Sequence, residues 1–299
     1  MENISMSIVA IGHNDESIEA SINQALGELD LRDIIEGKLV AIKPNDTYAD
    51  PGNLRGVTRG DTLRAVIRYI KQFNPKKIVA TGGSGAAITY DVFKLTGMID
   101  VLNEEKVEFF DHNIHPFEEV KLDFGPQRSI MVNPRVFEYE TLISLAQHKM
   151  HATATVTLCL KNIALSYPAA DYYGHPRDSM TGHDHNIFDD LQRFIVAMAK
   201  RFPIQLGIIV GHPSMIGTGP LDGKVVETGI TIASKDAIAA DAVGAKLFGF
   251  NHQAVRHLFE AGKLGLGKSD IVDINVKGVP LSEAIRIFTQ KAYGEELYF

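Results

Sequence analysis

Residues 39–46 read LVAIKPND and residues 77–85 read KIVATGGSG, and these two stretches decide the fold. Each begins with an apolar run that predicts a buried strand and then changes abruptly to polar or glycine residues. Between them, apolar side chains recur at the spacing of one helical face, at Leu63, Val66, Ile67 and Ile70. A strand, a helix and a strand at this spacing form a βαβ unit, which implies a parallel sheet with helices on its faces.

The same alternation extends over the rest of the chain. Apolar runs predict strands at 7–11, 107–110, 141–145, 205–210, 225–233 and 272–276. Helical spacing predicts helices at 15–26, 90–102 (broken at Gly97), 187–202, 236–248, 251–261 and 281–289. Residues 118–124 and 129–132 are expected to form short strands or a hairpin, and 152–160 fit a strand slightly better than a helix. We therefore expect an α/β fold with a mostly parallel sheet, as one unit over 1–299. The alternative is a division into two closely packed lobes, 1–146 and 204–299, with segment 147–203 between them.

Composition excludes several classes of protein. The 299 residues are 45% hydrophobic and 22% charged, as in a soluble globular protein. The net charge of −7 argues against a nucleic-acid partner, which needs a basic surface. No apolar run approaches the roughly eighteen residues of a transmembrane helix, and the N-terminus does not resemble a signal peptide. A cytoplasmic protein without membrane partners is expected.

Cysteine usage limits the cofactors. The single cysteine, Cys159, excludes an intramolecular disulfide, a cysteine zinc site and an iron–sulfur cluster held by cysteines. No iron–sulfur cluster is therefore expected. A homo-oligomer is expected only from the general habit of soluble enzymes.

The ends of the two deciding strands are candidate binding sites, because ligands of parallel sheets gather at the carboxyl ends of the strands. Lys43 and Asn45, on either side of Pro44, offer a cation and an amide to an anionic substrate. The turn Gly82, Gly83, Ser84, Gly85 could hold a phosphate or carboxylate on its backbone N–H groups. A capping role for the first pair, and a tight turn permitted by positive φ for the glycines, are the structural alternatives. Residues 217–223 form a second glycine-rich loop that could close over the same crevice.

The segment from His148 to His185 holds five of the eleven histidines. His151, His175, His183 and His185 are candidate ligands for a divalent metal such as nickel, zinc or iron, because neutral imidazole is a common metal ligand. Lys161 follows an apolar run, so burial is expected to lower its pKa toward that of a useful base. Lys161, His151 and His175 are the candidate catalytic residues. The alternative is a solvated loop with ordinary surface histidines.

Together these motifs resemble the family of domain of unknown function 362. The resemblance rests on Ile42–Asn45, the Gly82–Gly85 turn, His148–His151 leading to Lys161 and Asn162, Gly219–Gly223, and the helix expected from Asp236. It implies an α/β fold and supplies little about function. Some members of that family carry ferredoxin-like cysteine motifs, and this sequence has none.

The order His151, Lys161 ten residues later, and then His175 is also distantly similar to the nickel-pincer lactate racemases. In that family a lysine anchors the pincer cofactor, while histidines bind nickel and move protons. The similarity implies the same kinds of role for these three residues.

The leading hypothesis is an enzyme with a crevice at the carboxyl end of a parallel sheet. Lys43, Asn45 and the Gly82–Gly85 amides would bind a small anionic metabolite, and the histidines and Lys161 would perform acid–base or metal-assisted chemistry. A non-catalytic metabolite-binding protein and a partner module of a separate redox protein are the alternatives.

Overall fold

The computed structural model describes residues 6–174 and 189–299. Its strands are β1 (Ser7–His13), β2 (Leu39–Pro44), β3 (Lys77–Gly82), β4 (Glu108–Asp111), β5 (Glu118–Lys121), β6 (Ser129–Val132), β7 (Thr141–His151), β8 (Thr155–Thr157), β9 (Leu206–Ile216), β10 (Lys224–Val226), β11 (Ile230–Ser234) and β12 (Ile274–Gly278). Its α-helices are α1 (Ile18–Gly27), α2 (Arg32–Ile35), α3 (Gly60–Lys71), α4 (Thr89–Leu95), α5 (Met98–Glu105), α6 (Cys159–Ala164), α7 (Ala170–Tyr173), α8 (Leu191–Arg201), α9 (Ala237–Leu247), α10 (Arg256–Lys263) and α11 (Leu281–Tyr293). Short 3₁₀ helices occur at Pro134–Phe137, His252–Ala254 and Ile271–Asp273.

Within these residues, ten strands form one sheet. Its main path runs β12-β1-β11-β9-β7-β2-β3-β4, with β10 pairing β9 and β8 pairing β7. Five of the seven pairings along that path are parallel, and the two that involve β11 and its neighbours β1 and β9 are antiparallel. The α/β fold with a mostly parallel sheet is thus confirmed. The small hairpin β5–β6 forms a separate antiparallel pair.

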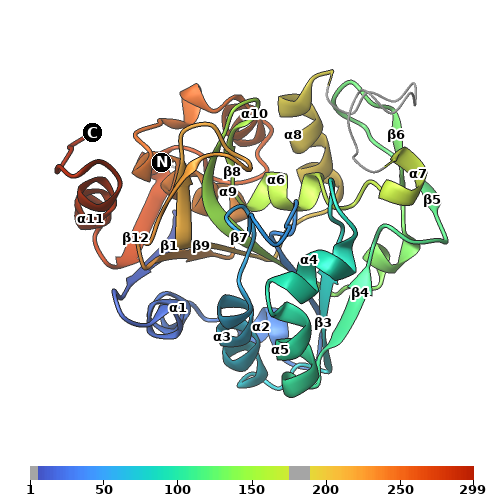
Figure 1. The fold of residues 1–299 in the computed structure, drawn as a ribbon. Helices are drawn as coiled ribbons and strands as arrows, with labels where there is room; N and C mark the ends of the chain where they lie inside the picture. Colours follow the sequence, from blue (N-terminus) through green and yellow to red (C-terminus); the bar gives the residue numbers. More distant parts are fainter. Residues whose placement is uncertain (1–5, 175–188) are drawn as a thin grey trace.

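Helices cover both faces of the sheet, as Figure 1 shows. The strand residues alternate between two apolar cores: Ala41 belongs to one, and its neighbours Val40 and Ile42 belong to the other. Helices α1, α3 and α5 pack against the face of Val40, whereas α6, α8, α9 and α10 pack against the face of Ala41. Successive side chains of a strand point to opposite faces, so two-sided cover requires the near-continuous apolar runs seen in the sequence.

Two expected elements differ from the structure because a local conformation interrupts them. Residues 225–233 form two strands, β10 and β11, because Gly229 adopts a positive φ of 63° between them. Residues 152–160 also divide: Thr155–Thr157 is strand β8, and helix α6 begins at Cys159. Helix α1 begins at Ile18, three residues later than expected, because Ser17 is its N-cap and accepts the backbone N–H of Ala20.

The division of the chain into two lobes stays a prediction. None of the helices in the described part of the chain has the length and apolar character needed to cross a membrane.

Candidate functional site

A cavity of about 220 Å³ lies at the carboxyl ends of β2 and β3, beneath α6. Its walls come from segments far apart in the sequence: Lys43, Asn45, Asp46, Thr47, Gly83, Gly85, Ala86, His151, Thr157, Lys161, Asn162, Leu165 and Pro220. The volume is below the roughly 300–1,000 Å³ of sites for drug-sized ligands. The cavity therefore suits a small metabolite.

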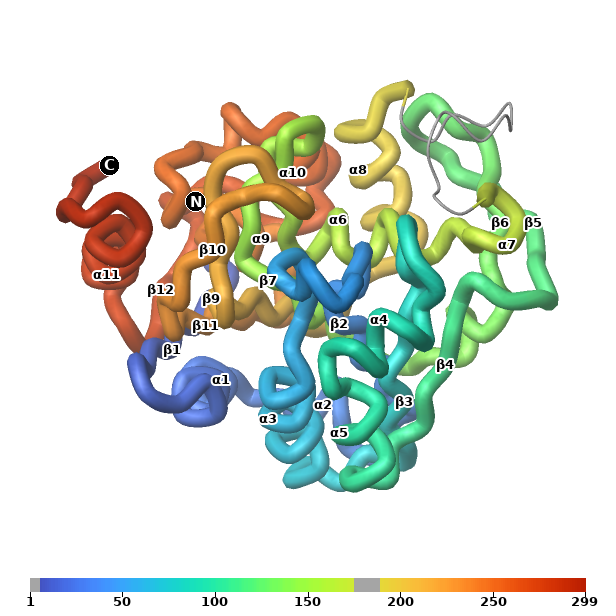
Figure 2. The backbone as a smooth tube through the Cα atoms, viewed as in Figure 1, coloured from blue at the N-terminus to red at the C-terminus, as the bar shows by residue number. Residues whose placement is uncertain are grey.

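Strand β7 and helix α6 bring His151 and Lys161 to this cavity. Strand β7 runs beyond the carboxyl end of β2, pairs with β8, and the chain then enters α6. Helix α6 packs against β7, α8 and α9, and Figure 2 shows it beside them. The buried carboxylate of Asp241 on α9 accepts the backbone N–H groups of Cys159 (2.7 Å) and Leu160 (3.0 Å) at the first turn of α6. This cap holds the helix that presents Lys161 and Asn162, although burial raises the pKa of Asp241 to about 7.

At the end of β2, a buried ion pair and an amide form one network. The Nζ atom of Lys43 donates to Asp46 Oδ1 at 2.5 Å and to Asn162 Oδ1 at 3.0 Å. The other carboxylate oxygen of Asp46 accepts the backbone N–H of Gly83 at 2.8 Å. Lys43 and Asp46 are each only 2% exposed. The charge of Lys43 is thus compensated within the protein.

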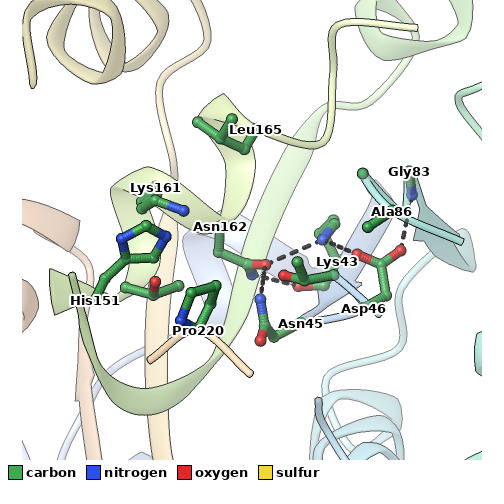
Figure 3. Close-up of a pocket in the computed structure, with 13 residues that line it drawn as sticks. Lys43, Asn45, Asp46, Gly83, Ala86, His151, Lys161, Asn162, Leu165 and Pro220 are labelled. Carbon is green, nitrogen blue, oxygen red and sulfur yellow. Dashed lines mark hydrogen bonds and ion pairs between the residues drawn. The ribbon is translucent and has the colours of Figure 1, made fainter. Parts of the chain in front are cut away.

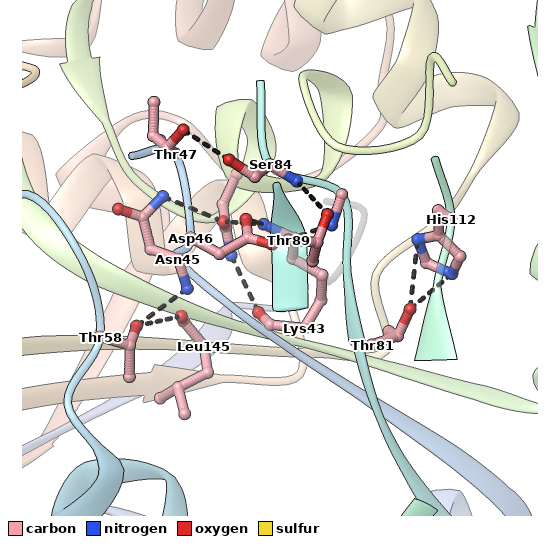
Figure 4. A network of polar contacts seen from close by, with 12 residues as sticks. Lys43, Asn45, Asp46, Thr47, Thr58, Thr81, Ser84, Thr89, His112 and Leu145 are labelled. Carbon is pink, nitrogen blue, oxygen red and sulfur yellow. Dashed lines mark hydrogen bonds and ion pairs between the residues drawn. The ribbon is translucent and has the colours of Figure 1, made fainter. Parts of the chain in front are cut away.

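The glycine turn is held by internal contacts, as Figure 4 shows. Gly83 N–H donates to Asp46, and Ser84 N–H donates to the hydroxyl of Thr89. A Cβ atom at Gly83 would lie 2.1 Å from Ser166 O, and one at Gly82 would lie 2.3 Å from Thr89 Cγ2. None of the three glycines has positive φ, so the structural alternative of a turn permitted by positive φ does not explain them. Gly82 and Gly83 are needed for close packing.

His151 lies beside Lys161 at the cavity wall, as Figure 3 shows. Its Nδ1 atom accepts the backbone N–H groups of Thr153 and Ala154, each at 3.1 Å. A nitrogen that accepts two hydrogen bonds carries no proton, so the neutral ring has its proton on Nε2. Burial, reinforced by the charges of Lys161 and Lys149, lowers the pKa of His151 to about 2. In this geometry His151 is a neutral hydrogen-bond donor.

The described residues do not fit a metal site. No group of three or more His, Cys, Asp or Glu side chains that could hold a metal occurs in residues 6–174 and 189–299. The Nε2 atom of His151 bears a proton and therefore offers no lone pair to a metal. The other expected ligands, His175, His183 and His185, lie outside the described residues.

Lys149 and His148 are buried and do not line the cavity. Lys149 Nζ donates to Gly56 O at 2.7 Å and lies 3.5 Å from Pro220 O, so it joins two loops next to the cavity. Burial, reinforced by the charges of Lys161 and Lys43, lowers its pKa well below the ordinary value. His148 stacks on Phe248 with ring centroids 3.9 Å apart, and burial lowers its pKa to about 4.

Among the residues singled out in the sequence, Lys43, Asn45, Gly83, Gly85, His151 and Lys161 line one cavity. Gly82 and Ser84 do not line it. Sequence reasoning missed Asp46, Thr157 and Asn162, although Asp46 and Asn162 stand directly beside residues that were chosen. Pro220, from the loop expected to close over the crevice, also lines the cavity.

Comparison with known structures supports the fold. The chain is similar to the lactate racemase apoprotein from Thermoanaerobacterium thermosaccharolyticum, with a TM-score of 0.51 and 15% identity over 82% of this chain and 58% of that chain. A protein from Thermotoga maritima gives a TM-score of 0.45 and 12% identity over 84% of this chain and 60% of that chain. The chain thus spans less than two thirds of the length of either. At 15% identity the likeness to the lactate racemase apoprotein concerns the fold alone, and the second structure, with a TM-score of 0.45, carries no argument.

None of the curated proteins compared with the chain matches it. Residues 40–246, which include every described residue of the cavity wall, match the model of one family. The chain belongs to that family, which is described as Domain of unknown function (DUF362).

Proposed function

We propose that this protein is an enzyme that binds a small anionic metabolite in the cavity and acts on it by acid–base chemistry at Lys161. The observation that supports the proposal is the balance of buried charge. Lys43, Lys149 and Lys161 are all buried at or next to the cavity. Among the described residues that line it, Asp46 is the one carboxylate.

A bound anion would offset this excess of positive charge. Asp46 compensates Lys43 through the 2.5 Å ion pair, whereas the hydrogen-bond acceptors of Lys149 are carbonyl oxygens. The charge of Lys161 also lowers the pKa of Lys149, His151 and His257. Two lysines and one carboxylate are among the described residues that line the cavity, so an anionic ligand is the expected complement.

The roles of the wall residues follow from their geometry. Lys161 would contact the anion and exchange a proton with it, because a positioned amine can act as a general acid or base. His151 would donate a hydrogen bond from Nε2 to the anion. Its lowered pKa keeps it neutral, so it binds without accepting a proton.

The fold neighbour agrees with this class of ligand. Lactate racemase is named for a reaction on a small carboxylate. Only the small size and negative charge of such a ligand bear on the proposal, and no step through a metal is proposed.

A non-catalytic anion-binding protein is the second candidate, and the geometry of His151 favours it. Because His151 acts only as a donor, Lys161 is the sole acid–base candidate of the described cavity wall with a role left open. The proposal of an enzyme therefore depends on acid–base chemistry at Lys161.

Calorimetric titration with acetate and with inorganic phosphate tests the binding step. We expect saturable binding by the native protein and a loss of at least about tenfold in Lys161→Met, which corresponds to about 1.4 kcal/mol. Lys200→Met is the matched control, because Lys200 is partly exposed on α8 and pairs with Asp123. Equal affinity in the native protein and Lys161→Met would overturn the proposal.

The catalytic step has its own test. A pool of small carboxylates and phosphate esters is incubated with the native protein and with Lys161→Met, and NMR spectra are followed over time. Conversion by the native protein alone is expected. Binding without any conversion would favour the non-catalytic binding protein.

A further inference from the structure

The orientation of the Asn45 side chain is fixed by its neighbour Asn162. The Nδ2 atom of Asn162 donates to Lys43 O and to Ser144 Oγ, each at 3.0 Å. The Oδ1 atom of Asn162 therefore faces Lys43 Nζ at 3.0 Å and Asn45 Nδ2 at 3.2 Å. Because an amide oxygen can only accept, Asn45 must present its nitrogen to Asn162. The Oδ1 atom of Asn45 therefore points away from Asn162.

That oxygen lacks a hydrogen-bond partner. Asn45 Oδ1 is buried without a partner in the described part of the chain, and so is the hydroxyl of Thr157. Both residues line the cavity, and each is at most 3% exposed. Buried polar atoms without partners are rare in folded proteins, and each costs about 1–3 kcal/mol. Two such atoms in the wall of one cavity indicate that its occupant supplies hydrogen bonds.

We infer that the ligand is a small oxyanion that also carries a neutral O–H donor, which Asn45 Oδ1 accepts, with Thr157 Oγ1 as a second contact. This inference rests on the proposed function, because the anion is assigned to the cavity by the charge of the lysines. Asn45 is then the residue that determines specificity.

The donor is a hydroxyl rather than an ammonium for electrostatic reasons. Lys161 lines the same small cavity and would repel an added ammonium, whereas Asp46, the carboxylate among the described lining residues, is already paired with Lys43. Two chemical sources supply an anion with a neutral O–H group: the P–OH of a hydrogen phosphate, and an alcohol next to a carboxylate. The cavity volume of about 220 Å³ admits either.

Matched pairs of probes test the inference in calorimetric titrations at pH 6. Phosphate carries an O–H donor at this pH and sulfate does not; glycolate carries one and acetate does not. Glycine replaces the hydroxyl of glycolate by an ammonium. We expect the donor-bearing member of at least one pair to bind about tenfold or more tightly than its partner, and glycine to bind more weakly than glycolate.

Variants assign the preference to its residues. Asn45→Leu removes the acceptor and is expected to bring the affinity ratio within each pair close to one. Thr157→Val removes a hydroxyl without a partner, so it is expected to fold, and to weaken binding of the donor-bearing probe at least about threefold. Ser166→Ala is the matched control: its hydroxyl is also buried and without a partner, but Ser166 does not line the cavity. No change in the affinity for any probe is expected in Ser166→Ala.

The outcomes separate this inference from the proposed function. A preference in the phosphate pair alone assigns the ligand to hydrogen phosphates, and a preference in the glycolate pair alone assigns it to hydroxy-carboxylates. Equal affinities within both pairs would overturn the inference and leave anion binding intact. A preference that persists in Asn45→Leu and in Thr157→Val would overturn the assignment to these residues. Binding of none of the five probes would overturn the proposed function, and the inference with it.

Discussion

The carboxyl ends of β2 and β7 lie near each other and bury similar groups, but they balance charge differently. At the end of β2, Lys43 pairs with Asp46 at 2.5 Å, and both are almost fully buried. At the end of β7, Lys149 donates to carbonyl oxygens, while His148 and His151 are kept neutral by burial. Paired charge at β2 is a fixed structural element. The Lys149 charge at β7 faces carbonyl oxygens instead of a carboxylate, so it depends on pH.

Breaking the β2 pair has the largest expected effect. Asp46→Asn removes the carboxylate that pairs with the buried Lys43 ammonium, and removing one partner of a buried ion pair typically costs about 3–5 kcal/mol. We expect the free energy of unfolding, measured by urea denaturation, to fall by this amount. Asp33→Asn is the control, because Asp33 pairs with Lys235 at the exposed surface and its loss should leave the midpoint unchanged. An Asp46→Asn midpoint equal to that of the native protein would show that the pair is not structural.

Lowering the pH is expected to reduce the free energy of unfolding through the buried His148 at the end of β7. The pKa of His148 is lowered to about 4, so between pH 6.5 and pH 4 the unfolded chain takes up a proton that the folded chain excludes. Stability is therefore lost as the pH falls through this window, by about 3 kcal/mol for this one group. In His148→Gln the loss over the same window should be smaller by that amount. Parallel curves of unfolding free energy against pH for the two proteins would contradict the assignment.

The alkaline range tests Lys149 through the slope of stability against pH. Its folded pKa lies below the unfolded value near 10.4, so the folded chain binds fewer protons between these two values. The native protein should therefore gain stability relative to Lys149→Met as the pH rises from 7 to 10, by at most about 1.4 kcal/mol per pH unit. Denaturation at pH 7, 8.5 and 10 measures the difference. A difference between the two proteins that stays constant with pH would mean that Lys149 is charged throughout this range.

The sequence predicted the fold better than the site, for a physical reason. Local apolar runs and helical spacing determine where β2, α3 and β3 begin and end, and these elements appear where they were expected. Lys43, Asn45, His151 and Lys161 were also identified, because strand ends and the segment rich in histidine are visible as patterns. Which of them is charged, neutral, donor or acceptor depends on partners that are distant in sequence.

Asp46 and Asn162 illustrate this limit. Asp46 compensates Lys43 within the same loop, and Asn162, at 119 positions from Lys43, fixes the amide of Asn45. Neither contact has a spacing signal. His151 was chosen as a metal ligand or a base, yet two backbone N–H groups contributed by the β7–β8 turn make it a donor. The tautomer of a histidine follows from such hydrogen bonds, which the sequence does not display.

The central claim is that the cavity beside Lys161 binds a small anion, and its most direct test is to locate one. Crystals of the native protein are soaked in arsenate, an oxyanion that carries an O–H group and scatters anomalously. The account predicts an anomalous peak inside the cavity within hydrogen-bonding distance of Lys161 Nζ, with an arsenate oxygen next to Asn45 Oδ1. Peaks confined to surface lysines, with the cavity free of arsenic, would contradict it.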